Sequence, residues 1–279
     1  MSAMACILGS CRFFYDREKP VDKTKLTASD YRIFQGTPAW DLAKAVEDGD
    51  KDKIRKIVND NPQLINYQDP TYGRTLLMLT VTNQQMKSFK TLLELNADVN
   101  IHDEGWGRFA LIEACSFNAY SIKFVKLLIE HGAKVNDVET GEGKNGLSGT
   151  DAKITPLIQA SRSNFLEAVK LLISENADIN YVSNRKQTAL GESIIIDNYK
   201  VAYYLLEHGA DYTLPIMYLF DYSKPDAEEG NIEDQRRIYI AKMLEDRDVD
   251  ILTRDYRYYY KIIDFLKARG IEVKKHTKL

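Results

Sequence analysis

Three glycines in the stretch ETGEGKNGLSGTD have the spacing Gly-x-Gly-x-x-Gly, at Gly141, Gly143 and Gly146. Glycines at this spacing let a backbone approach the phosphates of a dinucleotide where a strand precedes them and a helix follows. Here Leu-Ser-Gly-Thr-Asp follows, and no lysine stands after Gly146 as a P-loop requires. We interpret the stretch as a Gly-rich loop. A nucleotide-binding or enzymatic role for residues 139–151 stays as an alternative.

The histidines and acidic clusters do not form a metal or catalytic motif. His131 and His208 precede a Gly-Ala pair at the end of apolar runs, where we expect them to pack at a helix C-terminus. His102 and His276 lack ligand spacing, and the acidic stretch 48–52 lacks the closing Glu of an EF-hand. We therefore expect no metal, no cofactor and no catalytic residue, and a non-enzymatic function.

The cysteines are Cys6, Cys11 and Cys115, too few and too far apart for a disulfide framework. Cys115 lies in the apolar run ALIEACSF, which predicts a buried thiol. Residues 8–11 (LGSC) resemble the lipobox of bacterial lipoproteins, although the apolar stretch before them is short and has no basic region. We expect a cytoplasmic protein, or a periplasmic, membrane-anchored lipoprotein lipidated at Cys11 if the true start lies upstream of Met1.

The composition is that of a globular chain. It has 279 residues, of which 44% are hydrophobic and 28% charged, and a net charge of −3. Nucleic-acid-binding proteins usually carry a basic excess, so the charge argues against a nucleic-acid partner. No apolar run reaches the roughly 18 residues of a membrane span. We expect a monomer with no membrane contact unless Cys11 carries a lipid.

One phrase recurs four times, as LLELNADVN, LLIEHGAKVN, LLISENADIN and LLEHGADYT. Its alanine follows Asn or Gly each time, and these two residue types readily adopt the left-handed conformation that ends a helix. We predict such helix ends at Asn96, Gly132, Asn176, Gly209 and Gly270. The last two alanines lie 33 residues apart, and the other spacings are this period with insertions.

Each copy predicts two helices. In the third copy, the first helix spans 155–163, with Thr155 as its N-cap and Pro156 in its first turn. The second helix spans 165–175 and has apolar residues on one face. A period of about 33 residues with two helices predicts a solenoid, in which each unit packs on its neighbours.

The TPL opening, the LLxxGADxN ending and this period resemble ankyrin repeats. The resemblance implies an all-α solenoid of about six helix-turn-helix units with short β-hairpin fingers, and a scaffold for protein–protein interaction. The domain boundaries that we predict are a leader at 1–36, an N-terminal cap at 37–69, repeats at 70–103, 104–138, 152–183 and 184–213, a divergent C-terminal cap at 214–273 and a basic tail at 274–279. For the cap we expect helices over 215–222, 235–245 and 258–269.

The resemblance places partner contacts on the fingers and on the first helices, at the concave face. The residues at these positions are Tyr72, Arg74, Trp106, Arg108, Phe117, Arg162, Arg185 and Gln187. The four arginines suggest a partner protein with an acidic patch. About ten residues, including Gly141, Lys144 and Asn145, are inserted between the second and third copies and edge the same face. The alternative within this class is an inhibitor or immunity protein that neutralises a toxin or effector.

Overall fold

The computed structural model describes residues 17–116, 122–140, 152–214, 217–220, 235–238, 240–245, 247, 249 and 255–273. The α-helices in these ranges are α1 (Trp40–Asp48), α2 (Lys51–Asp60), α3 (Leu76–Thr82), α4 (Met86–Glu94), α5 (Ala110–Ala114), α6 (Ile122–Glu130), α7 (Pro156–Arg162), α8 (Leu166–Ser174), α9 (Ala189–Ile195), α10 (Tyr199–Glu207), α11 (Ile240–Glu245) and α12 (Tyr256–Lys267). Short 3-10 helices are η1 (Lys23–Lys25), η2 (Tyr31–Phe34) and η3 (Pro62–Leu64), and the strands are β1 (Met217–Phe220) and β2 (Gln235–Ile238).

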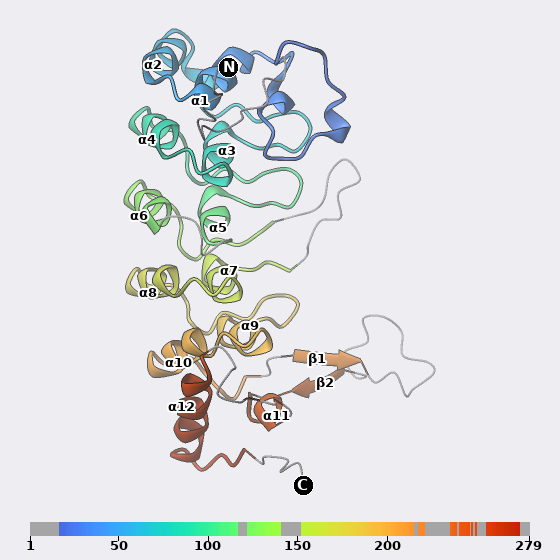
Figure 1. Cartoon of the computed structure of the whole chain (residues 1–279), viewed down its shortest axis with the longest axis vertical. Helices are drawn as coiled ribbons and strands as arrows, with labels where there is room; N and C mark the ends of the chain where they lie inside the picture. Colours follow the sequence, from blue (N-terminus) through green and yellow to red (C-terminus); the bar gives the residue numbers. More distant parts are fainter. Residues whose placement is uncertain are drawn as a thin grey trace, which may run out of the picture.

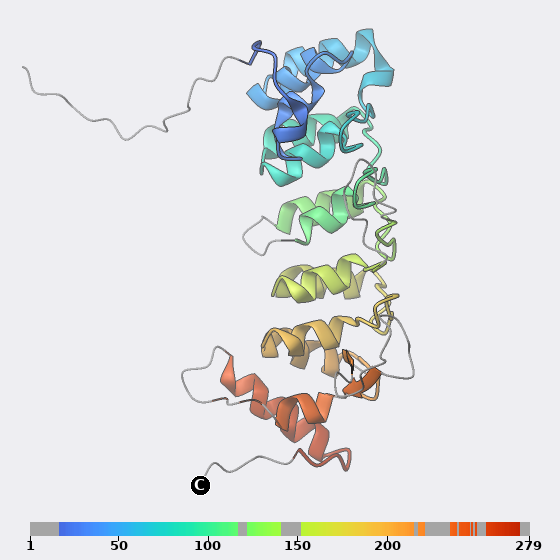
Figure 2. The same ribbon diagram turned by 90° about the vertical axis from the view of Figure 1, so that its right-hand side faces the viewer.

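The helices pair into units that stack along the longest axis of the molecule (Figure 1). The pairs are α1 with α2, α3 with α4, α5 with α6, α7 with α8, and α9 with α10. The first helices of successive units contact one another, and they form one column beside the column of second helices (Figure 1). Figure 2 shows the pairs as successive layers. The predicted all-α repeat solenoid is confirmed.

Threonine side chains begin most of the first helices of the central units. Thr75, Thr155 and Thr188 each accept a hydrogen bond from the backbone N–H three residues later, at 3.3, 3.3 and 2.9 Å. This bond satisfies one of the N–H groups that a helix start leaves without an intrahelical partner. The predicted cap at Thr155 and the place of Pro156 in the first turn are confirmed. Phe109 takes the equivalent position before α5 and provides no side-chain cap.

Left-handed residues follow the second helices as predicted. The backbone φ angle is +61° at Asn96, +86° at Gly132, +62° at Asn176, +94° at Gly209 and +79° at Gly270. Asn and Gly tolerate this conformation better than other residues, which explains why the two types alternate at this position. The recurring phrase therefore encodes the end of each second helix, and its leucines face the core.

The core runs through the stack and has no single centre. Aromatic pairs join neighbouring units: the Phe89 ring on α4 lies edge-on to Phe124 on α6, with centroids 4.8 Å apart, and Tyr199 on α10 meets Tyr259 on α12 at 5.3 Å. All four side chains are buried. Stability in such an array comes from contacts between neighbours.

Cys115, at the C-cap of α5, is fully buried, and burial raises the pKa of its thiol to about 12. Because the thiolate is the reactive form, we expect native protein carrying Cys6→Ser and Cys11→Ser to resist alkylation at mildly alkaline pH. In denaturing urea, the same variant should react at the rate of a free thiol. Mass spectrometry of timed reactions with iodoacetamide measures both rates, and equal rates in the two states would contradict the burial.

Residues 17–36 belong to the stretch that the sequence assigned to a leader, and in the structure they pack on the first units. η2 contacts α1 and places Ile33 and Phe34 in the core. The Tyr31 hydroxyl donates to the Gln85 side chain, at the start of α4. A four-residue 3-10 helix has no periodic pattern, so the leader predicted over 1–36 did not anticipate this packing.

The C-terminal region differs from the predicted helices. Residues 217–220 and 235–238 form an antiparallel pair of strands in which Met217 faces Ile238 and Phe220 faces Gln235. Among the described residues of this region, helix occurs in α11 and α12, so the helix predicted over 215–222 is wrong and the one predicted over 235–245 is correct only for Ile240–Glu245. The runs MYLF and RRIYI are rich in aromatic and β-branched residues, which favour strands. The final helix was predicted correctly, and α12 packs on α10.

Candidate functional site

An acidic side chain builds each of the first two fingers, the loops that lead into α3 and α5. The Asp69 carboxylate accepts three backbone N–H groups of residues 71–74, at 2.7 to 2.9 Å. Asp103 accepts those of Trp106 and Gly107, at 2.7 and 2.9 Å. Burial raises the pKa of both carboxyls, and these hydrogen bonds oppose the rise. The fingers are tight turns, and within the described residues they contain no β-strand of the predicted hairpins.

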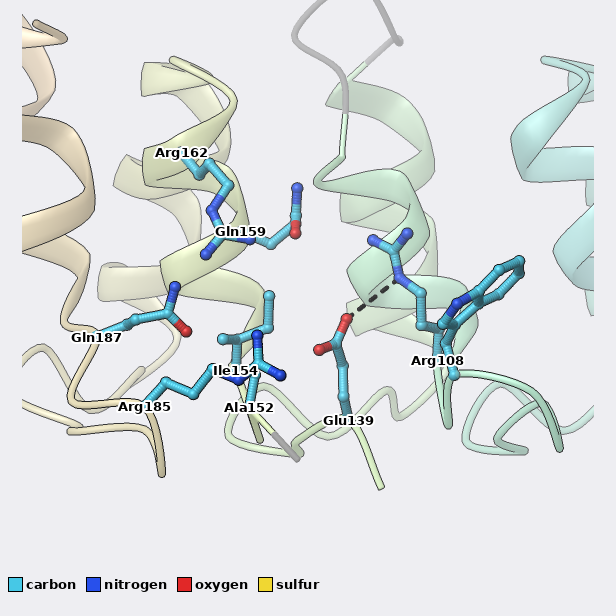
Figure 3. A pocket seen from close by; sticks show the side chains of 9 residues that line it. Arg108, Glu139, Ala152, Ile154, Gln159, Arg162, Arg185 and Gln187 are labelled. Carbon is cyan, nitrogen blue, oxygen red and sulfur yellow. Dashed lines mark ion pairs between the residues drawn. The ribbon is translucent and has the colours of Figure 1, made fainter. Parts of the chain in front are cut away.

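A hollow of about 290 Å³ lies on the finger side of the stack, between the finger before α5 and the finger before α9 (Figure 3). Two fingers, helix α7 and the two segments beside the Gly-rich insertion contribute its walls. Its lining residues are Trp106, Arg108, Glu139, Ala152, Ile154, Gln159, Arg162, Arg185 and Gln187. Five of the eight residues predicted for the concave face meet here: Trp106, Arg108, Arg162, Arg185 and Gln187.

Trp106 lines the hollow and also packs on the preceding finger. Its half-buried ring stacks on Tyr72, with centroids 6.5 Å apart and planes 11° apart. Tyr72, predicted as a contact residue, therefore supports Trp106 from outside the hollow. The Glu104 backbone N–H donates to the Tyr72 carbonyl at 2.9 Å and ties the two fingers together.

Arg74 does not lie at an exposed face, which corrects its assignment as a partner contact. Its side chain is 4% exposed. The guanidinium donates to Thr82 Oγ1 at 3.0 Å and to the Ala28 carbonyl at 3.3 Å, and it lies 3.5 Å from a Glu113 carboxylate oxygen. The N-terminal segment and α5 cover Arg74, and the sequence did not place either of them there.

Arg108 is held between two carboxylates. One terminal nitrogen lies 3.5 Å from Glu113, and the other donates to Ser116 Oγ at 2.6 Å. Its Nε lies 3.4 Å from Glu139 Oε1, the ion pair drawn in Figure 3, at an angle unsuited to a hydrogen bond. Glu113 and Glu139 are both buried. Arg108 therefore neutralises interior charge and fixes Glu139 in the wall of the hollow.

Arg162 and Arg185 differ in how they are paired. Arg162 Nε donates to the buried Glu192 carboxylate at 2.8 Å, and Gln187 donates to the other Glu192 oxygen at 2.9 Å. Arg185 is exposed and makes no ion pair with any residue in the described ranges. Three of the four predicted arginines thus have carboxylate partners, and Arg185 carries the open positive charge of the hollow.

A family model described as ankyrin repeats (3 copies) matches residues 42–139 and 142–215, more than half of the chain. The chain belongs to the ankyrin-repeat family. Ankyrin repeats form a protein–protein interaction module, and the fingers and first helices described above are those of ankyrin repeats.

Curated relatives match the ankyrin region. Neurogenic locus notch homolog protein 1 of Xenopus laevis is 30% identical over 165 residues, 59% of this chain and 6% of the relative. The Homo sapiens protein of the same name is 31% identical over 158 residues, 57% of the chain and 6% of the relative. Inversin of Canis lupus familiaris is 28% identical over 193 residues, 68% of the chain and 16% of the relative. The chain spans only a small part of each.

Some predicted residues lie outside the described ranges of the ankyrin array. They are Phe117, Gly141, Lys144, Asn145 and Cys11. Glu139 precedes the Gly-rich insertion and Ala152 follows it, and both line the hollow. The insertion thus leaves and rejoins the ankyrin array at the edge of the hollow.

Sequence reasoning missed the carboxylates and amides behind the ankyrin fingers. Glu113, Gln159 and Glu192 occupy equivalent positions, each four residues after the residue that begins a first helix. The sequence signal that could have identified them is a polar residue that recurs at one position of an otherwise apolar helix. The copies also show that Ile154 stands where Arg108 and Gln187 stand, so one finger contributes an apolar wall to the hollow.

The histidines of the ankyrin repeats have structural contacts. His131 and His208 each donate from Nδ1 to the carbonyl four residues earlier, at 2.8 Å, as expected at helix C-termini. His102 contacts the Gly107 carbonyl at 2.8 Å and Asp137 at 3.0 Å, and it joins two fingers. Across the described ranges, no group of three His, Cys, Asp or Glu side chains is placed to hold a metal. None of the helices described is long and apolar enough to cross a membrane.

Proposed function

We propose that this ankyrin protein is a non-enzymatic scaffold that binds a partner protein at the hollow between Trp106 and Gln187. The observation that carries the proposal is the open positive charge of Arg185 in a concave surface that also offers apolar area. Aromatic and arginine side chains in a partly enclosed surface are the residue types that dominate binding energy at interfaces. A rigid repeat array loses little conformational entropy when it binds.

The partner needs an acidic group only where it contacts Arg185, and not over its whole binding surface. Arg108 and Arg162 already pair with buried glutamates, so most of their charge is balanced within the chain. Arg185 is the arginine whose charge a partner can neutralise. We expect one ankyrin chain to bind one partner, in the cytoplasm or, if Cys11 is lipidated, at a membrane surface.

Charge reversal at Arg185 tests the proposal. Full-length wild type, Arg185→Glu and Lys126→Glu are used as baits in cell extract of the native organism, and bound proteins are identified by mass spectrometry. Lys126 is the matched control because it is an exposed cation on α6, in the column of second helices. We expect a partner that wild type and Lys126→Glu retain and Arg185→Glu loses.

Purified partner then gives the magnitude. Calorimetry should show that Arg185→Glu raises the dissociation constant at least about tenfold, because an attractive contact becomes repulsive. Both substituted residues are exposed, so the melting temperatures should match that of wild type. If Arg185→Glu and Lys126→Glu retain the same proteins with the same affinity, the hollow is not the binding site.

A further inference from the structure

The N-terminal segment of this chain already lies on the finger face of the first repeat, held by its backbone carbonyls. Tyr72 on the finger, Arg74 beside it and Asn83 after α3 each donate a side-chain hydrogen bond to this segment. The three bonds are Tyr72 Oη to Leu26 O at 2.6 Å, Arg74 NH1 to Ala28 O at 3.3 Å and Asn83 Nδ2 to Ser29 O at 2.9 Å. These three hydrogen bonds are all accepted by backbone atoms of the segment, and the half-buried Leu26 side chain also packs on the core.

The segment accepts these bonds because its carbonyls are free. Residues 26–29 follow η1 with extended backbone at Leu26 and a turn closed by the Asp30 N–H on the Thr27 carbonyl. An α-helix or a paired strand would use its carbonyls internally, whereas an irregular segment leaves most of them available. Side-chain donors on an ankyrin finger therefore select a segment without regular secondary structure.

The hollow continues this face over the next three repeats. Six of its lining residues occupy the same repeat positions as Tyr72 and Arg74, which hold the N-terminal segment. The positions are counted from the N-cap residues Thr75, Phe109, Thr155 and Thr188. The residues three before them are Tyr72, Trp106, Ala152 and Arg185, and the residues one before them are Arg74, Arg108, Ile154 and Gln187. The residues seven after them are Thr82, Ser116, Arg162 and Ile195. The first repeat thus shows a bound segment at positions that in the next repeats form the hollow.

The hollow has more hydrogen-bond donors than acceptors. Within the described ranges, Trp106 Nε1 and the whole Arg185 guanidinium have no acceptor, and Arg162 uses only its Nε. Gln159 donates one amide N–H to Ser163, and Gln187 donates one to Glu192. An arginine offers five N–H groups and a glutamine two. A ligand that fits must supply oxygen acceptors, and backbone carbonyls and carboxylates are the acceptors that peptides provide.

Polar and charged side chains stand on both sides of the hollow. Figure 3 shows Gln187 and Arg162 on one side and Glu139 with Arg108 on the other, and the Arg185 side chain extends toward Ile154 and Ala152 between them. Arg108 balances the Glu139 carboxylate on its side of the hollow, so Arg185 is the cation that attracts an acidic group. Ile154 is only 2% exposed, so the apolar surface that the hollow offers to a ligand is the half-buried ring of Trp106.

We propose that the hollow takes a linear segment of the partner, without regular secondary structure, that carries an Asp or Glu next to an apolar residue. Its carboxylate pairs with Arg185, its apolar side chain packs on the half-buried ring of Trp106, and its backbone carbonyls accept from Trp106 Nε1 and Arg162. This inference rests on the proposed function, since it names the chemical form of the partner at the same site.

Selection from a random linear peptide library tests the inference directly. Full-length protein is the target, and enriched peptides are synthesised for fluorescence-anisotropy titration. We expect enriched sequences with an acidic residue within one or two positions of an apolar one. Arg185→Glu should weaken their binding at least tenfold, Arg185→Lys less, and Lys126→Glu not at all. Enrichment of sequences without an acidic residue, or equal binding to Arg185→Glu, would overturn the inference.

Two changes in the peptide separate the contacts. Replacing its Asp or Glu with the amide should reduce affinity about as much as Arg185→Glu does. Replacing single backbone amides with esters weakens the carbonyl acceptor, and at least one ester should reduce affinity several-fold. If affinity survives every ester, the backbone is not recognised and the proposed mode is wrong.

The inference and the proposed function can fail separately. If a native partner is lost by Arg185→Glu but its isolated linear segments do not bind, the partner presents a folded surface. The proposed function then stands and this inference falls. If peptides bind as expected, both gain support, because the same charge reversal removes both interactions.

Discussion

Replacing Glu113 with leucine is expected to lower the free energy of unfolding by about 3–5 kcal/mol. The Glu113 carboxylate lies 3.5 Å from terminal nitrogens of both Arg74 and Arg108. Arg74 is 4% exposed, so removal of Glu113 leaves the Arg74 guanidinium buried and deprived of this carboxylate partner. Arg108 is 22% exposed and keeps Glu139, so its contribution to the loss is smaller.

Two further variants make the Glu113 experiment specific. Glu167→Leu removes an exposed carboxylate on α8 and should change stability by no more than about 0.5 kcal/mol. Arg74→Met combined with Glu113→Leu replaces the buried pair with apolar side chains, and it should be more stable than Glu113→Leu alone. Urea unfolding followed by circular dichroism gives the three values. A loss for Glu113→Leu no larger than that for Glu167→Leu would show that the pair is not structurally important.

This expectation gives most of the arginines on the finger face a structural role. Arg74 and Arg162 join successive repeats through the buried carboxylates of Glu113 and Glu192 on first helices, and Arg108 does so through Glu139, which precedes the Gly-rich insertion. Substituting them would destabilise the array, and lost binding would then reflect unfolding. Arg185 has no such internal role within the described residues, so it is the residue at which binding can be tested without loss of the fold.

The repeat scaffold could be predicted because its signals are local. A threonine before an apolar run fixes a helix start, and Asn96 or Gly132 fixes a helix end through its own backbone preference. These features recur, so each copy supports the interpretation of the others. The burial of Cys115 could be predicted in the same way, because Cys115 lies in the apolar run ALIEACSF of a first helix.

The parts that escaped prediction depend on contacts distant in sequence. The equivalent residues Arg108 and Gln187 are half-buried, whereas Arg74 is buried because residues 26–29 lie over it. Glu139 was not predicted as a site residue because its contact with Arg108 joins two neighbouring repeats. The strand pair β1–β2 joins segments separated by a polar stretch, and runs this short have no periodicity that distinguishes a strand from a helix, although their residue types favour strands.

Replacing Gly73 with alanine is expected to cost roughly 2–5 kcal/mol and to displace the second finger. Gly73 has a φ angle of +69°, a left-handed conformation that costs alanine about 1–2 kcal/mol. A Cβ atom there would also lie 2.5 Å from the backbone nitrogen of Glu104. That nitrogen donates to the Tyr72 carbonyl, so the clash falls on the bond that joins the two fingers.

Gly132 provides the matched control, because its φ angle is +86° and a Cβ atom would meet nothing within 4 Å. Gly132→Ala should therefore lose only the conformational part, about 1–2 kcal/mol. Gly132→Asn should lose less, since Asn96 and Asn176 hold the equivalent positions. Urea unfolding compares the three variants. Gly73→Ala should also reduce peptide affinity at the hollow, because Trp106 rests on Tyr72 across the displaced contact. If Gly73→Ala matches Gly132→Ala in stability and binds peptide normally, the fingers can separate without cost, and Trp106 is positioned by its own loop alone.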